Sequence, residues 1–129
     1  MTVRRLNPET MAPPAGAYSM GVLAPAAGNW LHIAGQIGVL PDGTTATGFV
    51  DQARAAWENL VRVLADAGMD ASHLVKVTAY VVEPDDLKHL NAVRSMFLGD
   101  SRPASTLVVV KALAKPEWLF EVEAVAYRA

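Results

Sequence analysis

The chain has 129 residues, of which 52% are hydrophobic and 19% charged, and a formal net charge of -2. This length and composition are typical of one folded domain with a single core, so we expect one domain over residues 1–129. Its 11 basic residues are scattered along the chain, which argues against a nucleic-acid partner. The absence of cysteine excludes a disulfide framework, thiol catalysis and cysteine-ligated zinc, and agrees with a reducing compartment.

The first residues do not have the pattern of a signal peptide. Arg4 and Arg5 are followed by prolines and polar residues rather than by an unbroken apolar stretch. No apolar run approaches the roughly 20 residues that are needed to cross a bilayer. We therefore expect a cytoplasmic protein without a membrane partner.

Short strands and turns are predicted in the first third of the chain. Residues 11–16 contain two adjacent prolines and predict a loop. Two strands are expected at residues 18–23 and 30–34, joined as a hairpin by a turn around residues 25–29. Pro41-Asp42-Gly43 predicts a second turn, because proline presets one dihedral angle and glycine tolerates a positive one.

The clearest helix lies between Gly48 and Gly68. Apolar residues recur there at the i, i+3, i+4 spacing of one buried stripe: Ala53, Ala56, Trp57, Leu60, Val61, Leu64 and Ala67. Gly68 stands where a left-handed residue would end the helix. A helix with one face in the core is therefore predicted.

The second half of the chain contains three more strands and a second helix. Residues 73–82 alternate between apolar and polar side chains, which predicts a strand. Asp85 and Asp86 are placed to cap a second helix that Gly99 ends. Its expected stripe is Leu87, Leu90, either Val93 or Arg94, and Phe97. Two final strands are expected at residues 105–111 and 119–127.

This order of elements favours an α+β fold with one mixed sheet of five or six strands and both helices on one face. We place apolar residues on the other face of that sheet: Leu107, Val109, Leu119 and Val125. Such a surface is too apolar to leave in water, so burial against another subunit is expected.

The last strand carries two glutamates of interest. Alternation places Glu121 and Glu123 with Leu119 and Val125, and an all-apolar set on the face toward the helices. A carboxylate at a subunit interface is costly unless it is paired or functional. Intersubunit salt bridges and a functional role are both open for each glutamate.

Several other chemistries have no support in the sequence. His32, His73 and His89 show no metal-ligand spacing and are interpreted as structural histidines. The serines lack a Gly-x-Ser-x-Gly context, and no phosphate-binding glycine loop is present. We expect no metal and no cofactor.

Successive segments resemble, in order, the signatures of the Rid (YjgF-type, reactive intermediate deaminase) family. They are Pro14–Ser19, Ile33–Ile37, Gln52-Ala53 with Asn59-Leu60 and Ala67-Gly68, Val75–Thr78, Leu90–Val93, Arg102–Ala104 and Glu121–Ala126. The similarity runs from about Pro14 to Tyr127. It implies a chorismate-mutase-like domain that assembles as a homotrimer around a central barrel, with small-molecule clefts between subunits.

The resemblance also implies a chemistry. Deaminase members of the family hydrolyse reactive enamines or imines to a keto acid and ammonia without a cofactor. By position, Glu121 would orient the attacking water. Tyr18 is the second catalytic candidate, since it offers a hydroxyl and a ring, and packing of that ring at an interface is the open alternative. The implied cleft would be lined by Ala34, Gly35, Asn91, Ser105, Thr106 and Leu107.

One position departs from the deaminase pattern. The arginine that grips the substrate carboxylate directly follows Pro-Ala in that pattern, whereas this chain has Ser105 there. Serine cannot form the charge-assisted fork that arginine makes with a carboxylate. Arg102 is a candidate replacement, although its odd spacing points it to the other face of an extended chain. Arg94 and Lys111 are further candidates.

Two functional hypotheses follow. The first is a cofactor-independent enamine or imine hydrolase with an altered substrate, for example one that lacks the usual carboxylate. The second is a non-catalytic protein that uses the same clefts to bind a metabolite or to present a surface to a partner. Ribonuclease activity, attached to some relatives, is disfavoured by the acidic charge balance and by the missing histidine pair.

Overall fold

A computed structural model of the chain describes residues 3–14 and 17–129. Ala15 and Gly16 of the predicted proline-rich loop lie outside the described residues. The described part of the chain forms β1 (Arg4–Leu6), β2 (Gly21–Leu23), β3 (Asn29–Ile37), α1 (Phe49–Asp66), η1 (Ala71–His73), β4 (Leu74–Val81), η2 (Pro84–Asp86), α2 (Leu87–Leu98), β5 (Ala104–Val109) and β6 (Phe120–Arg128).

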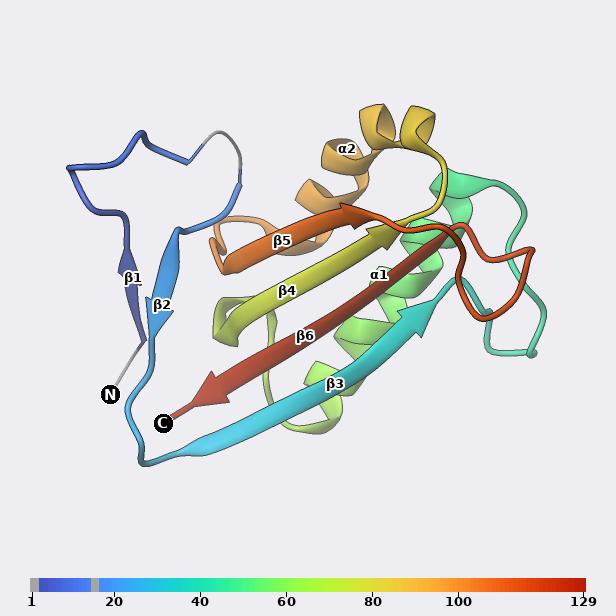
Figure 1. Cartoon of the computed structure of the whole chain (residues 1–129). Coiled ribbons are helices and arrows are strands. Elements are labelled where there is room, and N and C mark those ends of the chain that lie inside the picture. Colours follow the sequence, from blue (N-terminus) through green and yellow to red (C-terminus); the bar gives the residue numbers. More distant parts are fainter. Residues whose placement is uncertain (1–2, 15–16) are drawn as a thin grey trace.

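The main sheet has the strand order β3-β6-β4-β5. β6 is antiparallel to both of its neighbours, and β5 runs parallel to β4. Both helices lie behind this sheet in the view of Figure 1, which leaves its other face uncovered in the single chain. The predicted α+β class, with a mixed sheet and two helices on one face, is confirmed.

The predicted hairpin at residues 18–34 is wrong. β2 pairs with β1 in a separate two-stranded sheet, and β3 pairs with the C-terminal strand β6. An isolated parallel bridge between Ser19 and Ala104 is the point where the small sheet meets the edge of the main one. Six strands therefore form, but they are divided between two sheets instead of lying in one.

The core lies between the helices and the main sheet. Leu60 and Leu64 on α1 are fully buried, as are Phe120 and Val122 on β6. Trp57 of α1 stacks on Phe97 of α2, with ring centroids 6.0 Å apart and an interplanar angle of 11°. Most of the predicted stripe of the first helix and the whole apolar set of the last strand are thus in the core, whereas Val61 is only partly buried and Ala67, just after α1, is exposed.

The helix ends agree in part with the prediction. Gly68 and Gly99 follow the two helices with φ of 70° and 53°, a conformation that glycine adopts without strain. The predicted caps of the second helix are not observed, because Asp85 and Asp86 belong to the short helix η2 and Asp86 makes no side-chain capping bond. The chain enters α2 through this extra turn.

Strand register corrects the expected apolar face. Leu107 and Val109 pair with Ala79 and Val81, which point toward the helices, so they do not lie on the uncovered face. They stay about 40% exposed, at 39% and 44%, because β5 is the edge of the main sheet. Val125, in register with Lys76, does lie on the face that points away from the helices.

Candidate functional site

Glu121 lies near the start of β6, on the sheet face away from the helices. It is in register with Tyr80 of β4 on one side and with Ile37 of β3 on the other. A cavity of about 270 Å³ borders it, lined by Tyr80, Glu121 and the segment after β5: Val110, Ala112, Leu113 and Ala114. A half-buried carboxyl beside a small cavity can act on a molecule placed there.

The two glutamates of β6 have different surroundings. Burial raises the pKa of Glu121 above its ordinary value, and the neighbouring Glu123 charge raises it further. Glu123 accepts a hydrogen bond from the Tyr80 hydroxyl, and this bond raises the pKa of Tyr80. The structure therefore provides a hydrogen-bond donor for Glu123. Glu121 instead borders the cavity, and its carboxyl holds a proton up to a higher pH than an ordinary glutamate does.

A backbone irregularity in β3 makes room for the Glu121 carboxyl. The register between β3 and β6 shifts between Ile33 and Gln36, and the Ala34 carbonyl accepts a bond from the Gln36 side chain at 3.0 Å. A Cβ added to Gly35 would overlap the Glu121 carboxylate oxygen. The carboxyl can therefore occupy its position only because residue 35 has no side chain. We call Ala34, Gly35, Tyr80 and Glu121 the glutamate end.

A second group of predicted site residues meets where β5 begins. Asn91 and Arg94 come from α2, Arg102 from the loop before β5, and Tyr18 from the segment before β2. Ser19 holds the segment before β2 against the start of β5. Its amide donates a hydrogen bond to the Pro103 carbonyl at 2.9 Å, and its hydroxyl donates one to the Arg102 carbonyl. We call Tyr18, Asn91, Arg94 and Arg102 the cationic end.

The guanidinium groups of the cationic end have different partners. Arg94 is 91% buried, since 9% of it is exposed, and its Nη2 donates to Asn91 Oδ1 at 2.6 Å. Burial lowers the pKa of Arg94, and the charge of Arg102 lowers it further, while Tyr18 acts in the opposite direction. Arg102 Nη1 donates to the carbonyls of Gly99 and Ser101 at 2.9 and 2.8 Å, so it also holds the end of α2.

The predicted stretch from Ser105 to Leu107 does not present one face. Ser105 and Leu107 pair with Val77 and Ala79 and point to the helix side, whereas Thr106 pairs with Thr78 on the opposite side. Thr106 Oγ1 accepts a bond from Lys76 Nζ at 2.5 Å. Ser105 is therefore oriented toward the side of the sheet from which α2 supplies Arg94.

The two ends lie far apart within one chain. The cationic end meets β5 at Ala104, whereas Glu121 is in register with Tyr80, which pairs with Val108 near the end of that strand. Two strand spacings, from β5 through β4 to β6, separate them laterally. Figure 1 shows β5 running alongside β4, from the end of the sheet near β2 toward the opposite end. One chain alone does not bring the predicted site residues together.

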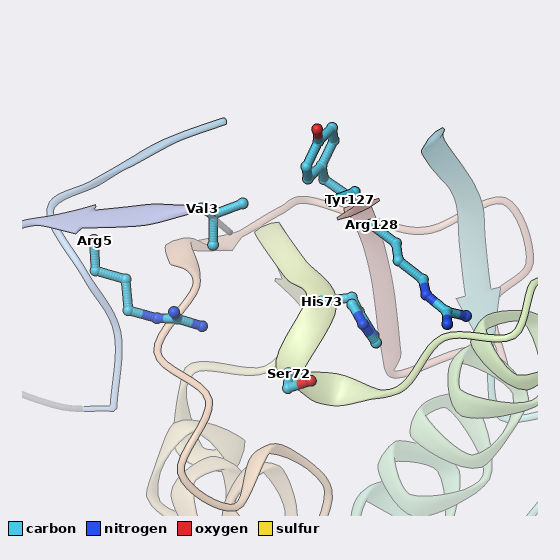
Figure 2. A pocket seen from close by; sticks show the side chains of 7 residues that line it. Val3, Arg5, Ser72, His73, Tyr127 and Arg128 are labelled. Atoms are coloured by element: carbon cyan, nitrogen blue, oxygen red, sulfur yellow. The ribbon is translucent and has the colours of Figure 1, made fainter. Parts of the chain in front are cut away.

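Another cavity, of about 480 Å³, lies at the C-terminal end of β6, the end far from Glu121. Figure 2 shows Arg5, His73 and Arg128 around it. These side chains are engaged with the protein itself: Arg128 donates to the Gly68 carbonyl at 2.6 Å, and His73 Nδ1 accepts from the Asp70 amide at 3.0 Å. The sequence did not predict this cavity, and it contains no predicted site residue.

Two further findings concern residues 3–14 and 17–129 alone. In this part of the chain, histidine, aspartate and glutamate side chains form no group of three or more that could hold a metal ion. Nor does it contain a helix with the length and apolarity needed to span a membrane.

Comparison with known proteins identifies the family and supports the fold. The family model described as Endoribonuclease L-PSP matches residues 9–128. A RutC family protein of Pyrococcus horikoshii is 38% identical over 122 residues, covering 93% of this chain and 94% of that protein. The human 2-iminobutanoate/2-iminopropanoate deaminase is 32% identical over 127 residues, covering 96% of this chain and 90% of that protein. A crystal structure from Yersinia pestis, of a Rid family protein of unknown function, superposes with a TM-score of 0.88 at 34% identity, covering 99% of this chain and all of that one.

The chain belongs to the Rid family. The resemblance seen in the sequence is therefore confirmed over nearly the whole chain.

Sequence reasoning missed part of the site. It left open whether Val93 or Arg94 belongs to the buried stripe of α2, and the structure buries both. It also did not foresee that Tyr80 would engage Glu123 and so distinguish the two glutamates. The strand alternation contained a signal for the latter, because it placed Tyr80 and Glu123 on the same face.

Proposed function

We propose that the protein hydrolyses imines or enamines of the 2-imino acid type, in clefts that form between the subunits of a homotrimer. The observation that carries this proposal is the Glu121 carboxyl, raised in pKa and fitted against Gly35 beside a cavity. The name of the human relative, a 2-iminobutanoate/2-iminopropanoate deaminase, supports this substrate class.

The proposed reaction consumes one water and releases ammonia. As the water oxygen bonds to the imine carbon, Glu121 accepts one proton of the water and the imine nitrogen takes a proton from solvent. Glu121 then returns its proton to the amine nitrogen as the carbon–nitrogen bond of the tetrahedral adduct breaks. Ammonia leaves, and the hydroxyl passes its proton to solvent and becomes the carbonyl of a keto acid. Tyr18 is assigned to hold the substrate through its hydroxyl, with Asn91 beside it.

Assembly is part of the proposal. Because one chain separates the glutamate end from the cationic end, a cleft between subunits would join one end from each of two chains. The uncovered sheet face, with Val108 at 38% and Trp30 at 43% exposure, supplies surface for such contacts. We expect light scattering at micromolar concentration to give three times the mass of the chain, and a monomer would contradict the assembly. We also propose that residues 1–129 form one domain and that the protein acts in the cytoplasm.

The test is an imine hydrolysis assay in which an amino-acid oxidase generates the substrate. Glu121→Gln keeps the shape of the side chain and removes the proton acceptor, so turnover should fall by roughly 10²- to 10⁴-fold. Glu83→Gln, at an exposed glutamate, serves as the matched control and should retain the rate. Equal rates for Glu121→Gln and the unmodified protein would sink the assignment.

A second candidate function is metabolite binding without turnover. Ser105 favours it, because the deaminase arginine is absent from that position. The Ser105→Arg variant separates the two: if the parent is silent and the variant is active, the cleft is built but serves a different ligand or a binding role. The net charge of -2 gives no support to an RNA substrate.

A further inference from the structure

Arg94 is a buried cation that lacks an acidic partner. Only 9% of the residue is exposed, and its Nε is buried with no hydrogen-bond partner in the described part of the chain. The ion pairs found among residues 3–14 and 17–129 are Arg62 with Glu58 and His73 with Asp70, so no carboxylate neutralises Arg94 or Arg102. A charge removed from water is costly unless a counterion is supplied.

The surroundings of Arg94 make this cost larger. Arg102 brings a second guanidinium close enough that its charge lowers the pKa of Arg94. Asn91 Oδ1 accepts one bond from Nη2 but has no charge to offset, and Arg102 is held by carbonyl groups. Two like charges, one of them nearly buried, therefore lie near each other, and within residues 3–14 and 17–129 they donate to the neutral oxygens of Asn91, Gly99 and Ser101.

The position of this pair relates it to the catalytic proposal. Arg94 reaches the start of β5 from α2, close to Tyr18, and Ser105 points to the same side of the sheet. Arg94 and the residue after Pro103-Ala104 are therefore on the same side of the sheet. The cation that is missing from position 105 is thus available from a different element.

We propose that Arg94, supported by Arg102 and oriented by Asn91, is the anchor for the carboxylate of a small ligand at the start of β5. This inference rests on the proposed function and deepens it, since it names the residue that selects the carboxylate of the 2-imino acid. The guanidinium fork can donate two parallel hydrogen bonds to a carboxylate, an interaction that Ser105 cannot provide. Contrary to the expectation from Ser105 alone, the substrate then keeps its carboxylate.

Calorimetric binding to the unmodified, assembled protein tests the anchor without any turnover. The probe is 2-oxobutanoate, the keto acid that hydrolysis of 2-iminobutanoate would release, and its methyl ester is the matched neutral compound. We expect the ester to bind at least tenfold more weakly. Equal affinities for the acid and the ester would overturn the proposal, as would affinity for inorganic phosphate equal to that for 2-oxobutanoate, which would indicate a general anion site.

The variant Arg94→Met removes the charge and keeps much of the side-chain bulk. It should weaken 2-oxobutanoate binding at least tenfold and leave ester binding unchanged. Arg62→Met, at an exposed arginine of α1 whose surface ion pair contributes little, is the matched control and should bind like the parent. If Arg94→Met does not fold, the comparison of acid and ester in the parent still decides.

The two proposals fail differently. If hydrolysis is absent but 2-oxobutanoate binds through Arg94, the anchor stands and the catalytic proposal is wrong. If hydrolysis occurs and Arg94→Met leaves both KM and binding unchanged, the catalytic proposal stands and the anchor is wrong.

Discussion

The two ends of the main sheet differ in how they hold charge. At the glutamate end, Glu121 lies on a strand, and Gly35 on the adjacent strand leaves room for its carboxyl. At the cationic end, Arg94 comes from a helix and Arg102 from a loop. The loop is joined to the segment before β2 by individual hydrogen bonds, such as that from the Ser19 amide to the Pro103 carbonyl. Each end contains a charge that is not neutralised by a partner within its own group.

This difference indicates a division of work. A strand-held carboxyl is positioned rigidly, which suits a group that must orient water. A helix and a loop can vary without disturbing the sheet, which suits the group that selects the ligand. If both ends serve one cleft, chemistry and selection are contributed by different subunits.

The strongest test of this division mixes two inactive variants. Glu121→Gln and Arg94→Met each damage one end, so in the proposed trimer neither variant alone would form an intact cleft. When the two chains are co-expressed and assemble at random, about a quarter of the clefts should combine both intact ends. We therefore expect activity near a quarter of that of the parent, far above either variant alone. A co-assembled sample that stays at the level of the variants would show that both ends of a cleft come from one chain.

A second test acts on the glutamate end alone. In Gly35→Ala, the added Cβ would overlap the Glu121 carboxyl and must displace it. Misplacement of a catalytic group by about 1 Å can cost roughly 100-fold in rate, so we expect kcat to fall between ten- and a hundredfold. Ligand affinity at the cationic end should be unchanged. Gly21→Ala, where the nearest contact would be an ordinary 3.8 Å from Leu6 Cβ, is the control. A normal kcat for Gly35→Ala would contradict the assigned position of Glu121.

The pH dependence of the rate provides a third test. In the proposed reaction Glu121 works as the carboxylate, and its pKa is raised, so kcat/KM should decline as pH falls, at a pH above the usual range for a glutamate. In Glu123→Gln the neighbouring negative charge is removed, which lowers the pKa of Glu121 and should shift the decline to lower pH. Profiles measured on both proteins check this. A shift in the opposite direction would exclude Glu121 as the titrating group.

The smallest expected effect is on stability. Tyr80→Phe removes the hydrogen bond that Glu123 accepts and should lower the free energy of unfolding by about 1 kcal/mol. Denaturant unfolding at neutral pH measures this, and the same substitution in a Glu123→Gln background should cost less. An equal loss in both backgrounds would mean that the hydroxyl contributes through something other than Glu123.

The sequence predicted local features of the fold well. The stripe of α1 and the alternation of β6 depend on helix and strand periods, which tertiary contacts did not override. The prediction of a hairpin was wrong because the partner of β3 is distant in sequence: β3 pairs with β6, about ninety residues later. The partner of β2 is the three-residue β1, which is too short to give a periodic signal.

The candidate site was predictable only in part. Glu121, Gly35 and Asn91 were found through the resemblance, and strand alternation correctly oriented Glu121. The sequence could not choose between Val93 and Arg94, because burial of α2 depends on how it packs against the rest of the fold. Nor could alternation alone show that Leu107 faces the helices, since the register of β5 against β4 decides this.

Gln52 of α1 has a consequence for how the cavity could be altered. Its buried amide donates to the Glu117 carbonyl at 2.9 Å and accepts from the Leu119 amide at 2.8 Å, so it fixes the chain just before Glu121. At the other end of the segment, the Val110 amide bonds to the Val81 carbonyl at 2.8 Å. Residues 111–116 are thus a loop whose two ends are each fixed by hydrogen bonds. Loops of other lengths could be grafted there to reshape the cavity while the register of β6 is retained.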